Sequence, residues 1–388
     1  MSDIFLRGMT WNHARGYAPL EACALAYQAA QPGLRIVWER RSLKDFEDFP
    51  VSRLAADYDL IVIDHPFVGH AARHGPLLPL DEHLPADFLI DQATHAVGGS
   101  HASYVHGGHQ WALAIDAATP VACWREDLLA RLGRSIPATW DDVLTLARAG
   151  LVEVPAAPIN CLMTFFALAL AHGETPCTEP ERVVSPGAGR AALAQLRELL
   201  VLCDPGVWSR NPIASLDRLA AADNSRAAYC LFPYGYSNYS RDGHAAHRLT
   251  YGDLPACDGA PLRTVLGGTG LAVSALRPHR AEAIAFARYC ASGEIQRTTY
   301  TRAGGQPGHR SAWLDAENNR LAHDYFRRTL PALDRAWVRP RHDGYLGFQE
   351  KAGEVVHAAL RGHLADADAL ARLDELHRAG LNPVPVRA

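Results

Sequence analysis

The chain has 388 residues, which is long for a single hydrophobic core and predicts two domains. Its 38 Lys and Arg residues nearly balance 42 Asp and Glu residues, so neither nucleic acid nor an anionic membrane is expected as a partner. No apolar run is long enough for a membrane-spanning helix, so no membrane insertion is expected.

The N-terminus and the cysteines bear on location. The chain begins almost directly with a strand, without the basic and apolar regions of an export leader. We therefore expect a cytoplasmic location, or a periplasmic one if a leader has been removed from this sequence. The eight cysteines include no Cys-x-x-Cys pair, which argues against a zinc ribbon or a redox dithiol and suits a reducing compartment.

The N-terminal segment has the pattern of a parallel α/β unit. Residues 3–11 and 34–41 are predicted strands, and residues 18–33 between them are a predicted amphipathic helix that ends at Pro32-Gly33. The apolar run Leu60–Ile63 predicts a third strand, buried on both faces. This order predicts a parallel sheet with a right-handed crossover and a ligand at the carboxyl ends of its strands.

Two polar clusters follow these predicted strands. Trp11, Asn12 and His13 follow the first strand, and Asp64 and His65 follow the third, so both clusters should face one crevice. Two interpretations of Trp11 stay open: an aromatic platform for a ligand, or a core residue that covers the sheet edge. The three polar residues His13, Asp64 and His65 are either ligand contacts or exposed loop residues.

A hairpin and a capped helix are predicted further along. Residues 101–116 alternate around a turn at Gly107-Gly108, and residues 119–133 predict a strand that runs into a helix. Thr139 and Asp142 have the spacing of a capping box at the start of a helix, and helical sequence continues to about Leu202.

Two groups of histidines have spacings that also occur at metal sites. His106 and His109 lie at the tip of the predicted hairpin, which favours an ordinary turn, and the series His65, His70, His74 is interpreted in the same way. No metal site is predicted.

The C-terminal half predicts an aromatic rim and a return strand. Residues 227–240 predict a strand that ends in Tyr234, Tyr236 and Tyr239, which either contact a hydroxyl-rich or planar ligand or pack a loop. A strand after the paired glycines 267–268, a helix over 280–292 and a loop over 301–313 follow, and the tail is mostly helical.

Five stretches, in this order, resemble family 1 solute-binding proteins of ABC importers, the maltose-binding-like group. Each motif is weak alone, but together they span nearly the whole chain. In that family the first stretch is a hairpin that crosses into the second domain, matched here by Asp116, Thr119, Pro120 and Trp124. The stretches are HQWALAIDAATPVACWREDLL, PATWDDVLTLA, GGTGLAVSA, GGQPGHRSAW and GYLGFQEKAGEVVHAAL.

The resemblance implies an α/β fold of two domains, the type II periplasmic-binding-protein-like fold with an interdomain cleft and hinge. The first domain is expected at 1–113 plus 268–311, and the second at 114–267 plus 312–388. Residues 115–117 and the glycines 267–268 are expected hinge positions, unless the glycines only permit tight packing.

The implied function is binding of a small polar organic solute, a sugar or a small carboxylic acid, in the cleft. The chain would act as an ABC-transporter-type substrate-binding protein with a permease as partner, or as a leaderless cytoplasmic relative. It is expected to be a monomer without a cofactor. Arg15 or Arg310 could meet a carboxylate. The predicted ligand-binding residues are Trp11, Asn12, His13, Asp64, His65, Asp116, Tyr234, Tyr236, Tyr239, Gly268, Thr269, Gln306, His309 and Arg310.

The alternative is an enzyme on this fold, similar to thiaminases, that uses a cleft His or Cys. Cys123 and Cys230 are the thiols nearest to the expected cleft, but apolar neighbours are more typical of buried, inert thiols. No nucleophile-elbow, P-loop, metalloprotease or dinucleotide-binding motif is present. We therefore expect a binding protein and not an enzyme.

Overall fold

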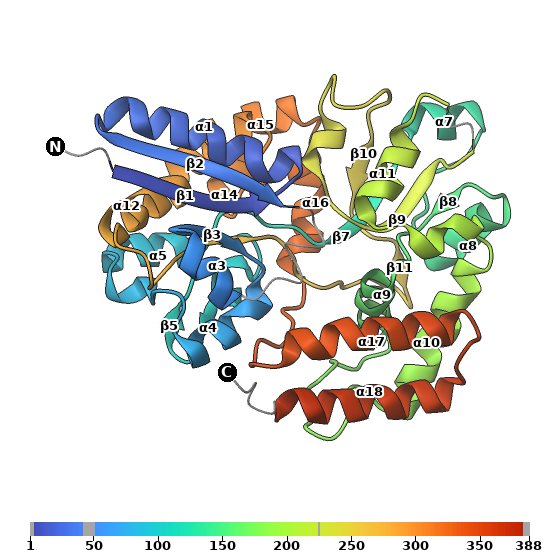
Figure 1. Ribbon diagram of the computed structural model, residues 1–388. Coiled ribbons are helices and arrows are strands. Elements are labelled where there is room, and N and C mark those ends of the chain that lie inside the picture. Colours follow the sequence, from blue (N-terminus) through green and yellow to red (C-terminus); the bar gives the residue numbers. More distant parts are fainter. Residues whose placement is uncertain (1–3, 42–50, 224–225, 383–388) are drawn as a thin grey trace.

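The computed structural model describes residues 4–41, 51–223 and 226–382, which form two α/β lobes, each built around its own sheet (Figure 1). The predicted α/β fold is confirmed. No helix in these described ranges is both long and apolar enough to cross a membrane.

The first lobe contains a five-stranded sheet in the order β2-β1-β3-β13-β6. The three N-terminal strands are parallel, as predicted, whereas β13 runs antiparallel to both β3 and β6. All four residues of β3 are buried, in agreement with its apolar run. The strands are β1 (Ile4–Trp11), β2 (Leu34–Arg41), β3 (Leu60–Ile63), β6 (Leu113–Ala114) and β13 (Gly270–Val273).

The helix after β1 starts earlier than predicted. It begins at Ala14 and not at Ala18, because the side chain of His13 accepts a hydrogen bond from the backbone N–H of Arg15 and caps the helix. Pro19 lies inside it. The helices that pack with this sheet are α1 (Ala14–Ala30), α3 (Val51–Asp57), α4 (Val68–His74), α5 (Ala86–Thr94), α6 (Ser100–Ser103), α12 (Arg280–Ala291) and α13 (Gly293–Ile295).

The second lobe contains a four-stranded sheet in the order β10-β7-β9-β8. Alternate residues of β7 serve two cores: Ala122 and Trp124 join the core under the helical layer, and Val121 and Cys123 join the opposite one. This two-sided burial explains the unbroken apolar sequence of the strand. The strands are β7 (Pro120–Trp124), β8 (Val152–Glu153), β9 (Tyr229–Tyr234) and β10 (Thr250–Gly252).

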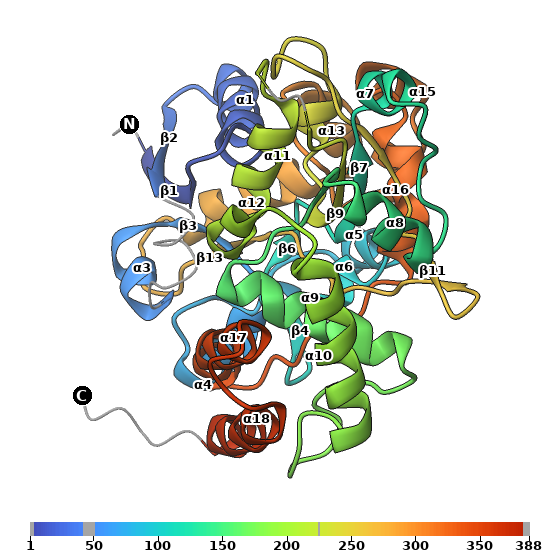
Figure 2. The ribbon, with the colours of Figure 1, turned by 90° about the vertical axis from the view of Figure 1, so that its right-hand side faces the viewer.

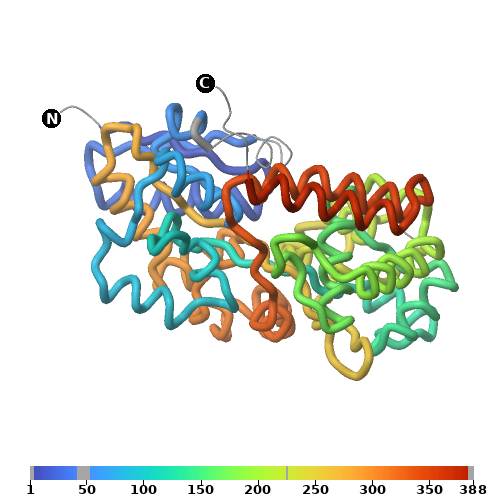
Figure 3. The backbone as a smooth tube through the Cα atoms, turned by 90° about the horizontal axis from the view of Figure 1, so that it is seen from below, coloured from blue at the N-terminus to red at the C-terminus, as the bar shows by residue number. Residues whose placement is uncertain are grey.

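A layer of four helices covers one face of the second sheet, where α17 packs on α9 and α18, and α10 packs on α9 (Figure 2). Seen from below, the C-terminal helices lie along the second lobe (Figure 3). The predicted capping box of Thr139 and Asp142 is present at the start of α8. The helices are α7 (Glu126–Arg131), α8 (Trp140–Arg148), α9 (Pro158–Ala171), α10 (Pro186–Leu200), α11 (Pro212–Ala220), α17 (Tyr345–Leu360) and α18 (Asp366–Leu381).

The remaining elements are short. The predicted hairpin is confirmed as β4 (Val105–His106) and β5 (His109–Gln110), with Gly107 and Gly108 at positive φ. A second hairpin joins β11 (Ala256–Cys257) to β12 (Ala260–Pro261). The expected loop over 301–313 contains the start of a helix, because His309 caps α14. The helices α14 (Arg310–Leu314), α15 (Ala316–Leu321) and α16 (Tyr325–Asp334) follow in sequence, and α16 packs on β7 and β10.

Two segments of the chain cross from one sheet to the other and lie side by side. The first runs from β6 to β7, and the second leads into β13. Ala118 bridges Gly267, and the backbone N–H of Thr269 donates to the carbonyl oxygen of Asp116 at 3.0 Å. The expected limit between residues 113 and 114 falls inside β6, and the one between 267 and 268 falls in the second crossing segment. These domain limits and the hinge motion stay predictions.

Candidate binding cleft between the lobes

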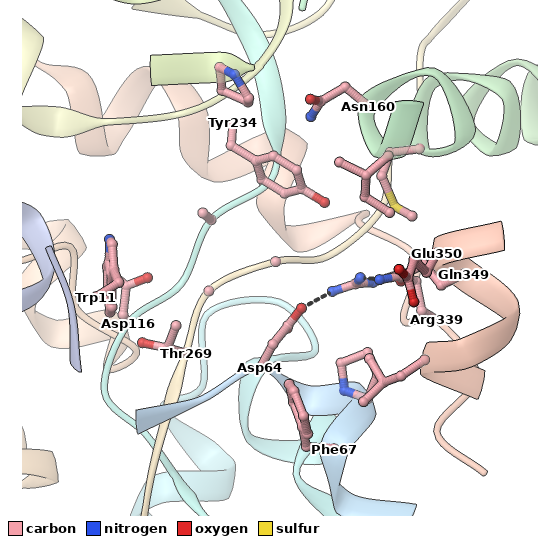
Figure 4. A pocket seen from close by; sticks show the side chains of 18 of the residues that line it. Trp11, Asp64, Phe67, Asp116, Asn160, Tyr234, Thr269, Arg339, Gln349 and Glu350 are labelled. Atoms are coloured by element: carbon pink, nitrogen blue, oxygen red, sulfur yellow. Dashed lines mark hydrogen bonds and ion pairs between the residues drawn. The ribbon is translucent and has the colours of Figure 1, made fainter. Parts of the chain in front are cut away.

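A cavity of about 570 Å³ lies where the carboxyl ends of β1 and β3 face the second lobe (Figure 4). Both lobes contribute to its wall. Seven of the fourteen predicted site residues line it: Trp11, Asp64, Asp116, Tyr234, Tyr236, Gly268 and Thr269. A cavity of this size suits a small organic molecule.

Trp11 belongs both to the cavity wall and to the core of the first lobe. Its side chain is only 4% exposed, and a Cβ atom on Gly16 would lie 2.5 Å from its indole ring. The glycine therefore lets α1 pass directly against the ring. Trp11 is therefore a core residue that also presents its ring at the cavity wall, so the two interpretations, core residue and ligand platform, are compatible.

A buried ion pair closes one end of the cavity. Arg15 donates to both carboxylate oxygens of Asp116, at 2.9 and 2.5 Å, and to the carbonyl oxygen of Gly235 at 2.9 Å. Its guanidinium also lies 4.5 Å from the ring centre of Tyr236. Burial alone would lower the pKa of Arg15, but the attraction of Asp116 outweighs burial and raises that pKa. Arg15 therefore stays charged and is committed to groups of the protein.

A second ion pair lies on the opposite side of the cavity, as Figure 4 shows. Arg339 donates to Asp64 at 2.7 Å and to the side-chain oxygen of Gln349 at 2.6 Å. Burial opposes ionisation of Asp64, but the charges of Arg339 and His65 lower its pKa below the ordinary value. This pair ties the end of β3 to the segment that leads into α17.

The tyrosines of the predicted rim lie in different places. Tyr234 projects into the cavity over Gly267, where a Cβ atom would lie 2.5 Å from its ring. Tyr236 packs against Arg15 and, edge-on, against His13. Tyr239 is buried away from the cavity, and its hydroxyl donates to Asp217 at 2.5 Å.

Six further predicted residues also lie outside the cavity lining. Asn12 is exposed, His13 caps α1, and His65 is buried beside Asp64. Gln306 is buried beneath the crossing segments, where it bonds the carbonyl oxygens of Ala117 and Gly235. His309 pairs with Asp91, and Arg310 pairs with Asp334. No ligand contact is proposed for these residues, because none of them lines the cavity.

The cavity also uses residues that sequence reasoning missed. Asn160, in the first turn of α9, is 7% exposed, and its side-chain oxygen has no hydrogen-bond partner among the described residues. The hydroxyl of Thr269 also has no hydrogen-bond partner among the described residues. A polar residue two positions after Pro158, in the first turn of an otherwise apolar helix, was the available signal for Asn160. The other missed contributors include Phe67, Met163, Asn211, Arg339, Gln349 and Glu350.

The cysteines of the enzyme alternative do not line the cavity. Cys123 and Cys230 face each other across β7 and β9 and are fully buried. Burial raises the pKa of the Cys230 thiol well above its ordinary value, so it is not primed as a nucleophile. Both thiols are therefore buried, as their apolar neighbours predicted, and the alternative of a cleft cysteine at these two positions is not supported.

Two α/β lobes with a cavity between the carboxyl ends of their strands define a two-lobed solute-binding protein. The family model described as bacterial extracellular solute-binding protein matches residues 26–321, and the chain belongs to this family. The family is extracellular, whereas the sequence predicted a cytoplasmic location unless a leader was removed. The location stays a prediction.

Solved structures show the same fold. Maltose-bound MalE3 of T. maritima superposes with a TM-score of 0.83 at 18% identity, covering 97% of this chain and 99% of that one. A solute-binding protein of an ABC transporter from Agrobacterium radiobacter K84, in complex with ribitol, gives 0.82 at 18% identity over 97% and 98%. The GacH receptor of Streptomyces glaucescens, solved without ligand and with acarbose, gives 0.80 at 18% identity over 99% and 100%. At this identity the likeness concerns the fold.

Proposed function

We propose that this chain binds a neutral, hydroxyl-rich solute, a sugar or a polyol, in the cavity between its lobes. It would deliver that solute to an ABC-type permease. The maltose and ribitol complexes of similar structures support this class of ligand.

One observation favours a neutral ligand over a carboxylic acid. Both arginines among the described residues of the cavity wall already pair with carboxylates, Arg15 with Asp116 and Arg339 with Asp64. Burial lowers the pKa of His70 and of His342, the histidines of the wall, so they add little positive charge at neutral pH. Among the described side chains of the wall, a ligand carboxylate would find no uncommitted cation and would meet Glu350 and Asp343.

The polar groups of the wall suit hydroxyls. The side-chain oxygen of Asn160 can accept, the hydroxyl of Thr269 can donate or accept, and Tyr234 adds both a ring face and a hydroxyl. Aromatic faces such as Trp11 and Tyr234 suit the C–H faces of a sugar.

Calorimetric titration of protein stripped of endogenous ligand tests the proposal. Neutral sugars and polyols such as maltose, ribitol and mannitol should bind at a stoichiometry of one, should be recovered unchanged, and should bind more tightly than dicarboxylates. Tyr234→Phe should weaken binding by about 5- to 10-fold, the effect of one hydrogen bond.

Tyr229→Phe is the matched control. Tyr229 lies on the same strand, is fully buried outside the cavity lining, and its hydroxyl has no partner among the described residues. Its loss should leave affinity unchanged. Tight binding of dicarboxylates with no response to any sugar or polyol, or turnover of the ligand, would contradict the proposal.

A further inference from the structure

Two histidines and a carboxylate gather at the edge of the cavity, and two of the three, His70 and Asp343, also line its wall. His70 and His74 lie one turn apart on α4, and Asp343 lies just before α17. Asp343 is 3.3 Å from Nδ1 of His70 and 3.1 Å from Nε2 of His74. The ligand-type atoms of all three side chains lie within 4.8 Å of one another. The sequence analysis interprets the spacing of His70 and His74 as an ordinary one and predicts no metal site. Asp343 lies 269 positions after His74, so the spacing of the histidines cannot reveal it.

The backbone holds this cluster together. A Cβ atom on Gly69 would lie 1.8 Å from the carbonyl oxygen of Arg341, so only glycine permits this approach of α4 to the 341–343 segment. Arg341 fixes the same segment by donating to the carbonyl oxygens of Ala102 and Val105, at 2.6 and 2.9 Å. The packed backbone thus brings the three residues together, and the side chain of His74 is the most exposed of the three, at 45%.

We propose that His70, His74 and Asp343 bind a divalent transition-metal ion of the zinc type. Two imidazole nitrogens and one carboxylate form a common three-residue set for Zn²⁺, with the fourth position left to water or another oxygen ligand. Ligand atoms at about 2.0–2.2 Å from a tetrahedral ion lie about 3.3–3.6 Å from each other, and the two contacts of Asp343 with His70 and His74, at 3.3 and 3.1 Å, are close to this spacing.

The surroundings are compatible with this ion. Arg73 is the competing cation, 3.5 Å from Asp343, but 49% of its side chain is exposed and it can turn into solvent. A bound ion would pin the start of α17 to α4. Because α17 packs on α9, the ion would join the two lobes.

A second cluster in the first lobe provides an internal comparison. Asp91 and His95 are one turn apart on α5 and lie near His309. In this cluster Nδ1 of His309 accepts the backbone N–H of Ser311 at 3.3 Å and caps α14, which leaves the ring proton on Nε2, the nitrogen that faces Asp91. His95→Gln is therefore the matched control for His74→Gln. Each substitution removes the second residue of an i,i+4 pair, and both side chains are nearly half exposed.

The test is titration of chelator-treated protein with Zn²⁺ against a competing indicator, without any solute. Wild type and His95→Gln should each bind one Zn²⁺ ion with the same affinity. The Zn²⁺ affinity of His74→Gln should be lower by about tenfold or more. Zn²⁺ should raise the melting temperature of wild type but not of His74→Gln, and bound Co²⁺ should show the intense visible bands of tetrahedral coordination. Equal melting of the metal-free proteins checks that the variants fold.

Equal Zn²⁺ affinity of wild type and His74→Gln, or a loss of binding in His95→Gln instead, would overturn the assignment. The measurement is independent of the proposed sugar or polyol, because no solute is present. Failure of the metal site would leave the solute proposal intact, and the reverse holds as well.

Discussion

Arg15 and Asp116 form a bidentate ion pair, with the Asp116 side chain fully buried and the Arg15 side chain 4% exposed. Arg15 comes from the first helix, Asp116 lies on the first crossing segment, and the third hydrogen bond of Arg15 reaches Gly235 after β9. One guanidinium therefore joins the N-terminal helix, a connection between the lobes and the second lobe. A buried pair of this kind is most sensitive to the loss of one partner.

Asp116→Asn should lower the free energy of unfolding by about 3–5 kcal/mol, because it leaves the Arg15 charge buried without a counter-ion. Urea unfolding in the absence of solute measures the change. Glu317→Gln removes one partner of an exposed ion pair with Arg320 and should leave stability nearly unchanged. Similar small effects for both substitutions would show that Arg15 finds another partner or water.

Trp11→Ala should also cost stability before any solute is added. The ring is 4% exposed and is part of the first-lobe core, so its removal should lower the free energy of unfolding by about 3–5 kcal/mol. Trp11→Phe keeps a ring against Gly16 and should cost clearly less. A Trp11→Ala protein that melts like wild type but binds solute weakly would instead make the ring a ligand platform only.

The fold could be predicted because its signals are local. The buried run Leu60–Ile63, the glycine turn at 107–108 and the capping box of Thr139 each reflect interactions within a few residues of the chain. The side chains at the carboxyl ends of strands, such as Trp11 and Asp64, could be placed at the cavity because parallel strands end at the same edge.

The rest of the site depends on long-range pairing. Arg339 meets Asp64 from 275 positions away, and no local pattern marks that contact. His309 and Arg310 were expected at the ligand because their loop resembles a loop that borders the ligand in the family, but Asp91 and Asp334 bind their side chains. Whether a polar side chain faces a ligand or a distant partner is decided by packing of the whole chain.

Gly268→Ala should destabilise the protein through a backbone clash. Gly268 has φ +99°, and a Cβ atom there would lie 2.3 Å from the carbonyl oxygen of Asp116 on the other crossing segment. We expect a loss of about 3 kcal/mol or more in the free energy of unfolding. Gly259→Ala is the matched control, since Gly259 also has positive φ, +83°, but its Cβ would meet no atom within 4 Å. It should cost only about 1 kcal/mol. Equal losses of stability for Gly268→Ala and Gly259→Ala would mean that the two crossing segments can move apart to make room for the Cβ atom.

The pH dependence of stability should carry a contribution from His65. This side chain is fully buried, and burial, followed by the charge of Arg339, lowers its pKa from 6.5 to about 4. Between these two values the unfolded chain binds a proton at His65 and the folded protein does not. Stability should therefore fall as the pH drops below about 6.5, and this contribution should stop changing below the folded pKa. The full loss is about 3 kcal/mol.

His65→Gln isolates this contribution, because other buried histidines add to the total. Urea unfolding between about pH 7.5 and pH 4.5 should give a shallower fall of stability for His65→Gln than for wild type. The control is His83→Gln, which removes an exposed histidine and should keep the wild-type slope. Parallel curves for wild type and His65→Gln would mean that His65 is protonated in the folded protein at the same pH as in the unfolded chain. The Asp64 carboxylate, 3.1 Å from Nδ1 of His65, would then stabilise the imidazolium enough to offset its burial.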